Sequence, residues 1–188
     1  MNPIGHLGIV LSVFGFVVFG LVARDETRAA KIVVVTALPM GLAPDIDLRI
    51  TQLAHRGLTH TIWAAFLAGG VLALVAFRFE PLALAGKGEE TFYGFVTGFG
   101  GICCHLAGDV ITPMGIKPLY PLLEKPHTFD LVYASNQSAN LALLVFGVIT
   151  FQIAVQQARI ADPVPAYTLG FVHRDLGFES ESGTDIET

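Results

Sequence analysis

The sequence predicts an all-α protein: a polytopic integral membrane helical bundle with about five transmembrane helices. Of the 188 residues, 53% are hydrophobic and 14% are charged, and the mean hydropathy is +0.62. Soluble domains carry about 25% charged residues, so this composition excludes an ordinary soluble domain, a disordered chain and a basic nucleic-acid-binding domain. The apolar residues also form nearly uncharged runs of up to about 20 residues, the helical length that crosses a hydrocarbon layer of about 30 Å. We therefore expect a lipid bilayer, and no nucleic acid, as the partner of this chain.

The predicted spans follow from these apolar runs. The first contains no Lys, Arg, Asp or Glu over its whole length. The second is the shortest, with Lys31 near its start and Pro39 inside, and we count it as a span because basic side chains can extend from a helix end to the interface. The third and fourth carry ionisable residues only toward their ends, and the fifth ends among glutamines. The predicted spans are residues 4–23, 29–43, 60–79, 91–111 and 139–158.

Residues 1–158 form one transmembrane domain in this interpretation, and residues 159–188 form a polar tail. The tail is acidic, contains much of the formal net charge of −5, and is predicted to be disordered. No basic segment precedes the first apolar run, so we expect that run to be retained and not cleaved as a signal peptide. Cys103 and Cys104 are adjacent and lack the spacing of a thiolate zinc site, which indicates packing residues.

One membrane face is predicted to gather the coordinating residues. If the spans alternate in direction, the starts of the first and third and the ends of the second and fourth share a face. An ionisable group at membrane depth costs several kcal/mol unless it is paired or metal-bound, so convergence from four segments indicates a functional site. The residues at this face are His6, Asp45, Asp47, His55, His60, His105, Asp109 and, in the following loop, His127.

Local spacings at this face favour metal ligation. His105 and Asp109 are four residues apart on a predicted helix, so both side chains lie on one face and can bind one ion. A stripe of glycines precedes them on the same face and allows a neighbouring span to approach closely. Asp45 and Asp47 flank one residue in a turn, where two carboxylates can reach one or two cations. These patterns predict a centre built from several segments.

The stretch from His55 to His60 is the most unusual in the chain. Gly57 allows a sharp turn, and Thr59 is predicted to cap the following helix and hold His60 at its start. Arg56 lies between these imidazoles and carries a planar cation suited to a phosphate or a carboxylate.

Four motifs occur in a characteristic order within residues 1–121. They are His6 at the start of the first span, Pro44-Asp-Ile-Asp47, His55-Arg-Gly-Leu-Thr-His-Thr61 and His105-Leu-Ala-Gly-Asp-Val-Ile-Thr-Pro-Met-Gly115. Together they resemble the YdjM-like family of membrane-bound, predicted metal-dependent hydrolases. The resemblance implies a metal site and a hydrolase activity. The family pattern has a histidine after its second aspartate, where this chain has Leu48.

We expect a divalent metal centre of one or two ions. Mixed imidazole and carboxylate ligands without thiolates favour zinc, with manganese or iron as alternatives. Such a centre can hydrolyse an ester of an amphiphilic substrate, most simply a phospholipid or an isoprenoid phosphate. Asp47 or His55 would complete the ligand shell or act as the general base, and Arg56 would bind the anionic oxygen of the transition state. The predicted metal ligands are His6, Asp45, His60, His105 and Asp109.

Three other interpretations stay open. The same His/Asp cluster could serve a cation or proton transporter, although transport sites tend to lie near the bilayer midplane on broken helices. Paired histidines could bind haem, which leaves the aspartates unexplained. A metal could also tie the helices together without any chemistry.

The distribution of basic residues predicts an orientation in the cell membrane. Lys and Arg are more frequent at the span ends opposite the histidines than beside them. Basic residues favour the cytoplasmic side, so we expect a multi-pass protein whose His/Asp site lies on the outer face and whose tail is cytoplasmic.

Overall fold

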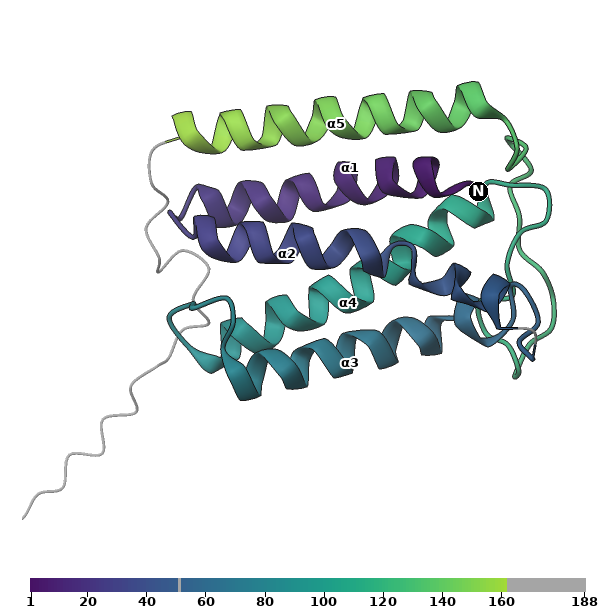
Figure 1. Cartoon of the computed structure of the whole chain (residues 1–188), viewed down its shortest axis with the longest axis horizontal. Helices are drawn as coiled ribbons and strands as arrows, with labels where there is room; N and C mark the ends of the chain where they lie inside the picture. The colour runs from purple at the N-terminus through teal and green to yellow at the C-terminus, as the bar shows by residue number, and fades with distance from the viewer. Residues whose placement is uncertain (51, 162–188) are drawn as a thin grey trace, which may run out of the picture.

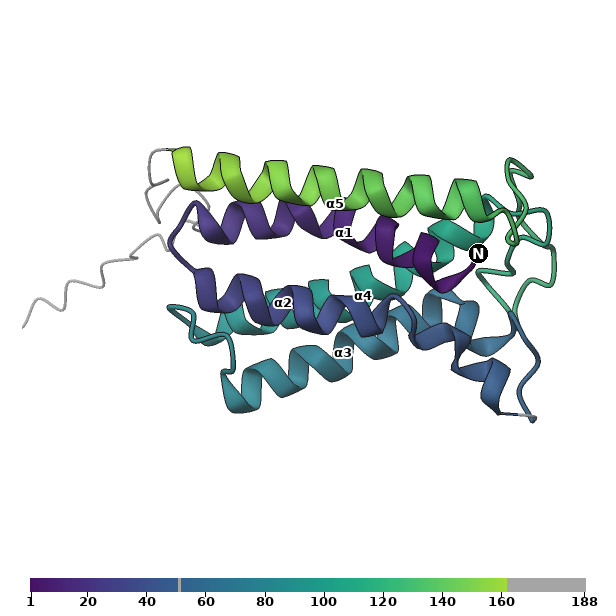
Figure 2. The ribbon, with the colours of Figure 1, turned by 45° about the horizontal axis from the view of Figure 1, so that its top comes forward.

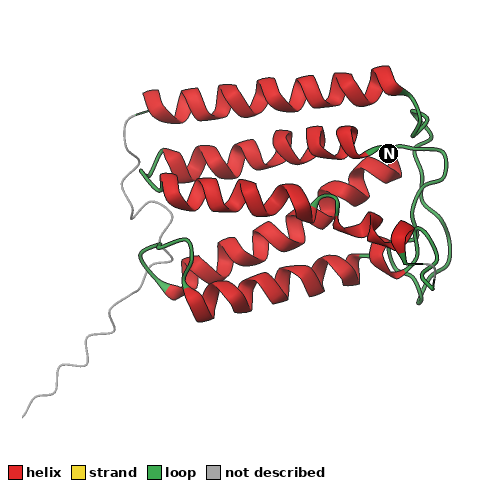
Figure 3. Cartoon of the chain, in the orientation of Figure 1, coloured by secondary structure: helices red, strands yellow, loops and turns green. Residues whose placement is uncertain are grey.

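The computed structural model describes residues 1–50 and 52–161 and shows helices that run side by side as a bundle (Figure 1). Within this part of the chain all the regular elements are helices and none is a strand, so the all-α prediction is confirmed (Figure 3). The predicted disorder of the acidic tail concerns residues 162–188, which lie outside the described residues. The elements are α1 (Pro3–Val22), α2 (Thr27–Met40), η1 (Ala43–Arg49), η2 (Leu58–His60), α3 (Ile62–Phe79), α4 (Lys87–Val110) and α5 (Gln137–Ile160), of which η1 and η2 are short 3-10 helices.

Polar side chains fix where the membrane helices begin. Asn2, Thr61 and Asn136 each accept a backbone N–H from the first turn of α1, α3 and α5, respectively. Such caps satisfy donors that have no partner within the helix. The prediction that Thr59 caps the third span is therefore wrong by two residues. Thr59 instead donates a hydrogen bond to a carboxylate of the candidate site, described below.

Two helix pairs make the most extensive contacts, α1 with α5 and α3 with α4. Figures 1 and 2 both show α1 and α5 side by side, and in Figure 1 α4 crosses obliquely beside α2 and α3. Glycines permit this approach: a Cβ at Gly94 would lie 2.6 Å from the Leu72 carbonyl oxygen, and one at Gly101 would lie 2.5 Å from Met40 Cβ. The predicted glycine stripe of α4 thus faces two neighbours, α3 and α2.

Four segments in the described part of the chain are long and apolar enough to cross a membrane: α1, Thr27–Arg49, α3 and α5. The fourth predicted span corresponds to α4, which has 24 residues but is less apolar. Its first turn is charged, and most of its glycines, with His105 and Asp109, are buried. Lipid contact therefore falls mainly to α3 and α5, whose outward side chains are large and apolar.

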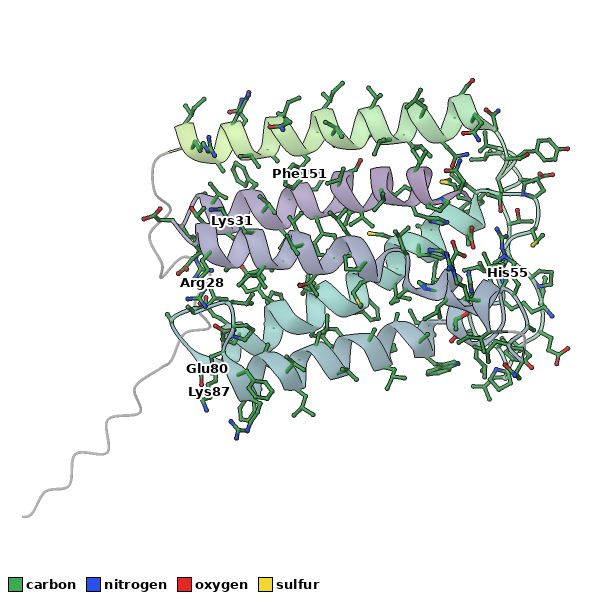
Figure 4. All side chains as sticks on the ribbon, viewed as in Figure 1. Arg28, Lys31, His55, Glu80, Lys87 and Phe151 are labelled. Carbon is green, nitrogen blue, oxygen red and sulfur yellow. The ribbon has the colours of Figure 1, made fainter. Side chains whose placement is uncertain are left out.

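The two ends of the bundle differ in chemistry. One end holds the start of α1, the end of α2, the start of α3 and the end of α4, as the alternation of spans predicts (Figure 1). His55 lies at this end, whereas Arg28, Lys31, Glu80 and Lys87 lie at the opposite one (Figure 4). We call the end with His55 the histidine end.

Candidate metal centre

The histidine end contains a cluster of buried ionisable side chains. His6 comes from α1, Asp45 from η1, His60 from η2, and both His105 and Asp109 from α4. The three histidines are 0% exposed and Asp109 is 1% exposed, whereas Asp45 is partly exposed. The structure thus brings together all five residues predicted as metal ligands, from four separate elements.

The centre of the cluster is the approach of His60 to His105. Their Nε2 atoms lie 3.1 Å apart. Asp45 Oδ1 lies 3.5 Å from each of these nitrogens. Asp109 Oδ2 lies 3.4 Å from His60 Nε2 and 3.5 Å from His105 Nε2. Two imidazole nitrogens and two carboxylate oxygens therefore converge, as in a mixed nitrogen and oxygen metal site.

Hydrogen bonds at the other ring nitrogens assign the tautomers. His105 Nδ1 lies 2.9 Å from the Gly41 carbonyl oxygen, which can only accept, so Nδ1 carries the proton. His60 Nδ1 lies 3.2 Å from an oxygen of Asp47 and 3.0 Å from the Thr59 hydroxyl. With its proton on Nδ1 toward the carboxylate, neutral His60 also presents a lone pair at Nε2. Two lone pairs at 3.1 Å repel each other unless a cation or a proton lies between them.

His6 adds a third imidazole to the cluster. Its ring stacks on His105 with a centroid distance of 3.8 Å, and its Nε2 lies 3.6 Å from Asp109 Oδ1. Among the described residues, neither ring nitrogen of His6 has a hydrogen-bond partner, and neither does Asp109 Oδ2. Each buried polar atom without a partner costs about 1 to 3 kcal/mol. A divalent metal ion would give Asp109 Oδ2 and one ring nitrogen of His6 a partner, so the donor set fits the metal that the sequence predicts.

The electrostatics of the cluster favour positive charge. Asp109 Oδ1 pairs with the Met1 amino group and lies 2.9 Å from Arg56 Nη2. His60 lies between carboxylate oxygens of Asp45, Asp47 and Asp109, each within 3.5 Å of one of its ring nitrogens. The carboxylates therefore attract cations into a region from which water is largely excluded.

Asp47 lies behind His60 and organises the loop between η1 and η2. Its Oδ2 accepts hydrogen bonds from the Arg56 backbone N–H at 3.1 Å and from the Thr59 hydroxyl at 2.8 Å, and its Oδ1 lies 2.9 Å from His55 Nδ1. Asp47 is 3% exposed, and it also contacts His60 Nδ1. Its role here is to orient His60 and His55, as carboxylates hydrogen-bonded to imidazole ligands commonly do.

Arg56 ties the loop to the end of α4. Its guanidinium donates to the Thr112 hydroxyl at 3.1 Å, to the Gly115 carbonyl at 2.7 Å and to Asp109 at 2.9 Å. Its backbone has a φ of 58°, which places it in the left-handed region. Arg56 therefore lies beside the cluster as predicted, with two of its three nitrogens already bound by the protein.

Two other residues of interest lie outside the cluster. His127 is exposed, and its backbone pairs with Ile116 in an isolated antiparallel bridge. Leu48, at the position where the family pattern has histidine, is 64% exposed. Neither side chain belongs to a group of possible metal-binding residues in the described part of the chain.

A cavity of about 520 Å³ reaches the cluster at Asp45. Asp45 is the most exposed of the five predicted ligands, at 20%. Apolar side chains of α1, α2 and η1 form much of the wall, and arginines supply positive charge. We call this space the Asp45 cavity, and its lining includes Pro3, Pro39, Leu42, Asp45, Ile46, Leu48, Arg49, His55 and Arg56.

Sequence reasoning missed three contributors to the histidine end. The Gly41 carbonyl fixes the His105 ring, but a backbone group has no signature in the residue pattern. Thr59 contacts Asp47 and not the start of α3. Lys117 lines a second cavity at this end, and only its place in the same connector as His127 pointed to it.

Gly108→Ala is expected to weaken metal binding without disrupting the helices. A Cβ at Gly108 would lie 2.7 Å from His6 Nδ1 and 2.9 Å from His6 Cε1, so the imidazole must move. We expect a loss of about 10-fold in metal affinity, the lower end of the effect of disturbing a ligand's support. Titration of the purified proteins with zinc measures this.

Gly88→Ala is the matched control, because Gly88 is also in α4 and a Cβ there meets nothing within 4 Å. Alanine favours the helix at both positions. Equal zinc affinity in the two variants would contradict a role for His6 in the centre.

Comparison with known proteins supports the resemblance seen in the motifs. The family model described as YdjM inner membrane protein matches residues 1–173. No curated protein and no solved structure shows significant similarity to this chain. The match includes every residue of the buried cluster and all five long helices. The chain therefore belongs to the YdjM inner membrane protein family.

Proposed function

We propose that this protein is a membrane-embedded, metal-dependent hydrolase that acts on a phosphoester of an amphiphilic substrate. The observation that carries the proposal is the convergence of His60 and His105 Nε2 with carboxylate oxygens of Asp45 and Asp109. These residues, with His6, would hold one or two divalent ions, of which zinc is the first to test. Such an ion supplies an activated water and a Lewis acid for the phosphoryl oxygen.

His55 is suited to act as the general base. Its Nδ1 lies 2.9 Å from Asp47 Oδ1, so the proton is held at Nδ1 and Nε2 keeps a lone pair. The side chain is 36% exposed and lines the Asp45 cavity, where substrate and water can reach it. Asp47 thus orients His55 in the same way that a carboxylate orients a catalytic histidine in acid-base enzymes. Of the two residues considered for this role, the geometry favours His55.

The Asp45 cavity favours an amphiphilic substrate. Its wall combines apolar side chains such as Leu42 and Ile46 with the cations Arg49 and Arg56. The cavity lies at the end of the bundle, where membrane spans emerge from the hydrocarbon layer. A phospholipid or an isoprenoid phosphate would place its apolar chain along the wall and its phosphate near Asp45. Arg56 would stabilise negative charge that develops on the phosphoryl oxygens.

Hydrolysis of such lipids by the purified protein tests the proposal. We expect phosphate release from vesicles that contain phosphatidic acid or an isoprenoid phosphate, loss of release with a chelator, and recovery with added zinc, manganese or iron. Stoichiometric metal without hydrolysis of any phosphoester would instead indicate a structural centre. Ion flux in vesicles without hydrolysis would indicate transport.

We also propose that the histidine end faces outward and the tail lies in the cytoplasm, in keeping with the excess of basic residues at the opposite end. Reaction of a membrane-impermeant thiol reagent with an Asp130→Cys variant in intact cells tests this, since Asp130 is exposed at the histidine end. If the variant reacts only after the membrane is opened, the histidine end faces the cytoplasm and the proposed orientation is wrong. Because Cys103 and Cys104 are native, the variant is compared with the unmodified chain.

A further inference from the structure

A second cavity of about 460 Å³ is also lined by His55 and Arg56. Its walls come from the loop between η1 and η2 and from the beginning of the connector between α4 and α5. Among the described residues that line it are the cations Arg56 and Lys117, and no carboxylate. We call this space the Lys117 cavity. Its charge is suited to an anion, in contrast to the carboxylate-rich cluster beside it.

Arg56 has one side-chain nitrogen without a partner in this region. Its side chain is 9% exposed, and its Nη1 and Nη2 atoms are bound to Thr112, Gly115 and Asp109. Within the described part of the chain, the buried Nε has no hydrogen-bond partner. A buried donor without a partner is unfavourable, so an acceptor oxygen at this position would be stabilising.

Lys117 supplies the second positive charge. It is partly buried, and its Nζ lies 5.9 Å from the centroid of the Tyr120 ring. No carboxylate of the described residues forms an ion pair with it. Tyr120 also lines the Lys117 cavity. A mobile ammonium group and a planar guanidinium group together are a common arrangement for binding phosphate.

We propose that the Lys117 cavity binds a phosphate group next to the metal centre. This deepens the proposed function and rests on it for the identity of the ligand. His55 and Arg56 line both cavities, so a ligand with two linked phosphates can place one near Asp45 and the other near Lys117. The bound group is then the terminal phosphate of an amphiphilic diphosphate ester, or inorganic phosphate released by hydrolysis.

Binding of inorganic phosphate to the purified, metal-containing protein tests the site. Lys117→Gln should weaken the affinity about 10-fold, which is the effect of losing about 1.4 kcal/mol from one charged hydrogen bond. Lys117→Arg should retain most of the affinity, because it keeps the charge. Lys125→Gln should match the unmodified protein, since Lys125 is exposed on the same connector but does not line the cavity. Equal phosphate affinity in the Lys117→Gln and Lys125→Gln variants, or no binding to the unmodified protein, would overturn the proposal.

A second pair of probes identifies the source of the phosphate. Vesicles with an isoprenoid diphosphate are compared with vesicles that contain the corresponding monophosphate. Tighter binding of the diphosphate that depends on Lys117 assigns the cavity to the terminal phosphate of the lipid, whereas equal binding of the two lipids assigns it to released phosphate. These measurements read binding and not turnover. Intact hydrolysis with no Lys117-dependent binding would reject this site alone, and intact binding without hydrolysis would reject only the proposed function.

Discussion

Asp109→Asn is expected to remove stoichiometric metal from the protein while the helices remain folded. Asp109 Oδ2 lies 3.4 Å from His60 Nε2 and 3.5 Å from His105 Nε2, at the centre of the buried cluster. A neutral amide keeps the size of the side chain but loses the negative charge that offsets a divalent ion. Loss of a group that only orients a metal ligand already weakens metal binding about 10- to 100-fold, so we expect a loss of at least about 100-fold for a ligand itself.

Elemental analysis of detergent-purified protein measures this effect, and circular dichroism reports the helices. Asp130→Asn is the control, because Asp130 is exposed at the same end, and its φ of 50° suits asparagine. It should retain the metal content of the unmodified protein. If Asp109→Asn binds as much metal as that control, the cluster does not form the metal centre.

His55→Gln is expected to lower hydrolysis about 100- to 10,000-fold, the range for removal of a general base. The metal content should stay unchanged, because the ring nitrogens that face each other at 3.1 Å belong to His60 and His105 and not to His55. Glutamine can still contact Asp47 but has no lone-pair nitrogen to accept a proton. Single-turnover rates with a phospholipid substrate, measured at equal metal occupancy, give the effect.

His127→Gln provides the comparison for His55. His127 is also exposed at the histidine end, and its side chain belongs to no group of possible metal-binding residues in the described range. Its hydrolysis rate should equal that of the unmodified protein. If the His55→Gln variant also hydrolyses the substrate at the rate of the unmodified protein, His55 is not the general base and Asp47 is the remaining candidate.

The fold could be predicted because the bilayer imposes strong local rules. Each span must satisfy its backbone hydrogen bonds internally, so a long apolar run indicates a helix without knowledge of its neighbours. The segment with Lys31 and Pro39 follows this rule, since Thr27–Arg49 is long and apolar enough to cross. α4 is the less regular case, because polar residues within its span, such as Thr97, His105 and Asp109, are buried inside the bundle and not exposed to lipid.

The membership of the site followed from the same rules, since alternation of the spans brings His6, Asp45, His60 and the end of α4 to one face. The role of each residue did not follow. Asp47 and Asp45 are two positions apart in one short helix, yet Asp47 contacts His60 Nδ1 and Asp45 approaches Nε2. That division depends on the turn of η1 and on Thr59, whose contact with Asp47 spans 12 positions in sequence.

By itself the sequence determined that this protein crosses a membrane as helices and gathers imidazoles and carboxylates at one face. The length of the apolar runs sets the spans, and the alternation of their direction sets which residues share a face. Both can be read from the order of residues in the chain. Only the tertiary structure decided that His60 and His105 turn their Nε2 atoms toward each other, with Asp47 and the Gly41 carbonyl holding the opposite nitrogens. The physical reason is that ring orientation and tautomer depend on contacts between segments at distances of about 3 Å, which helix packing and loop geometry set together.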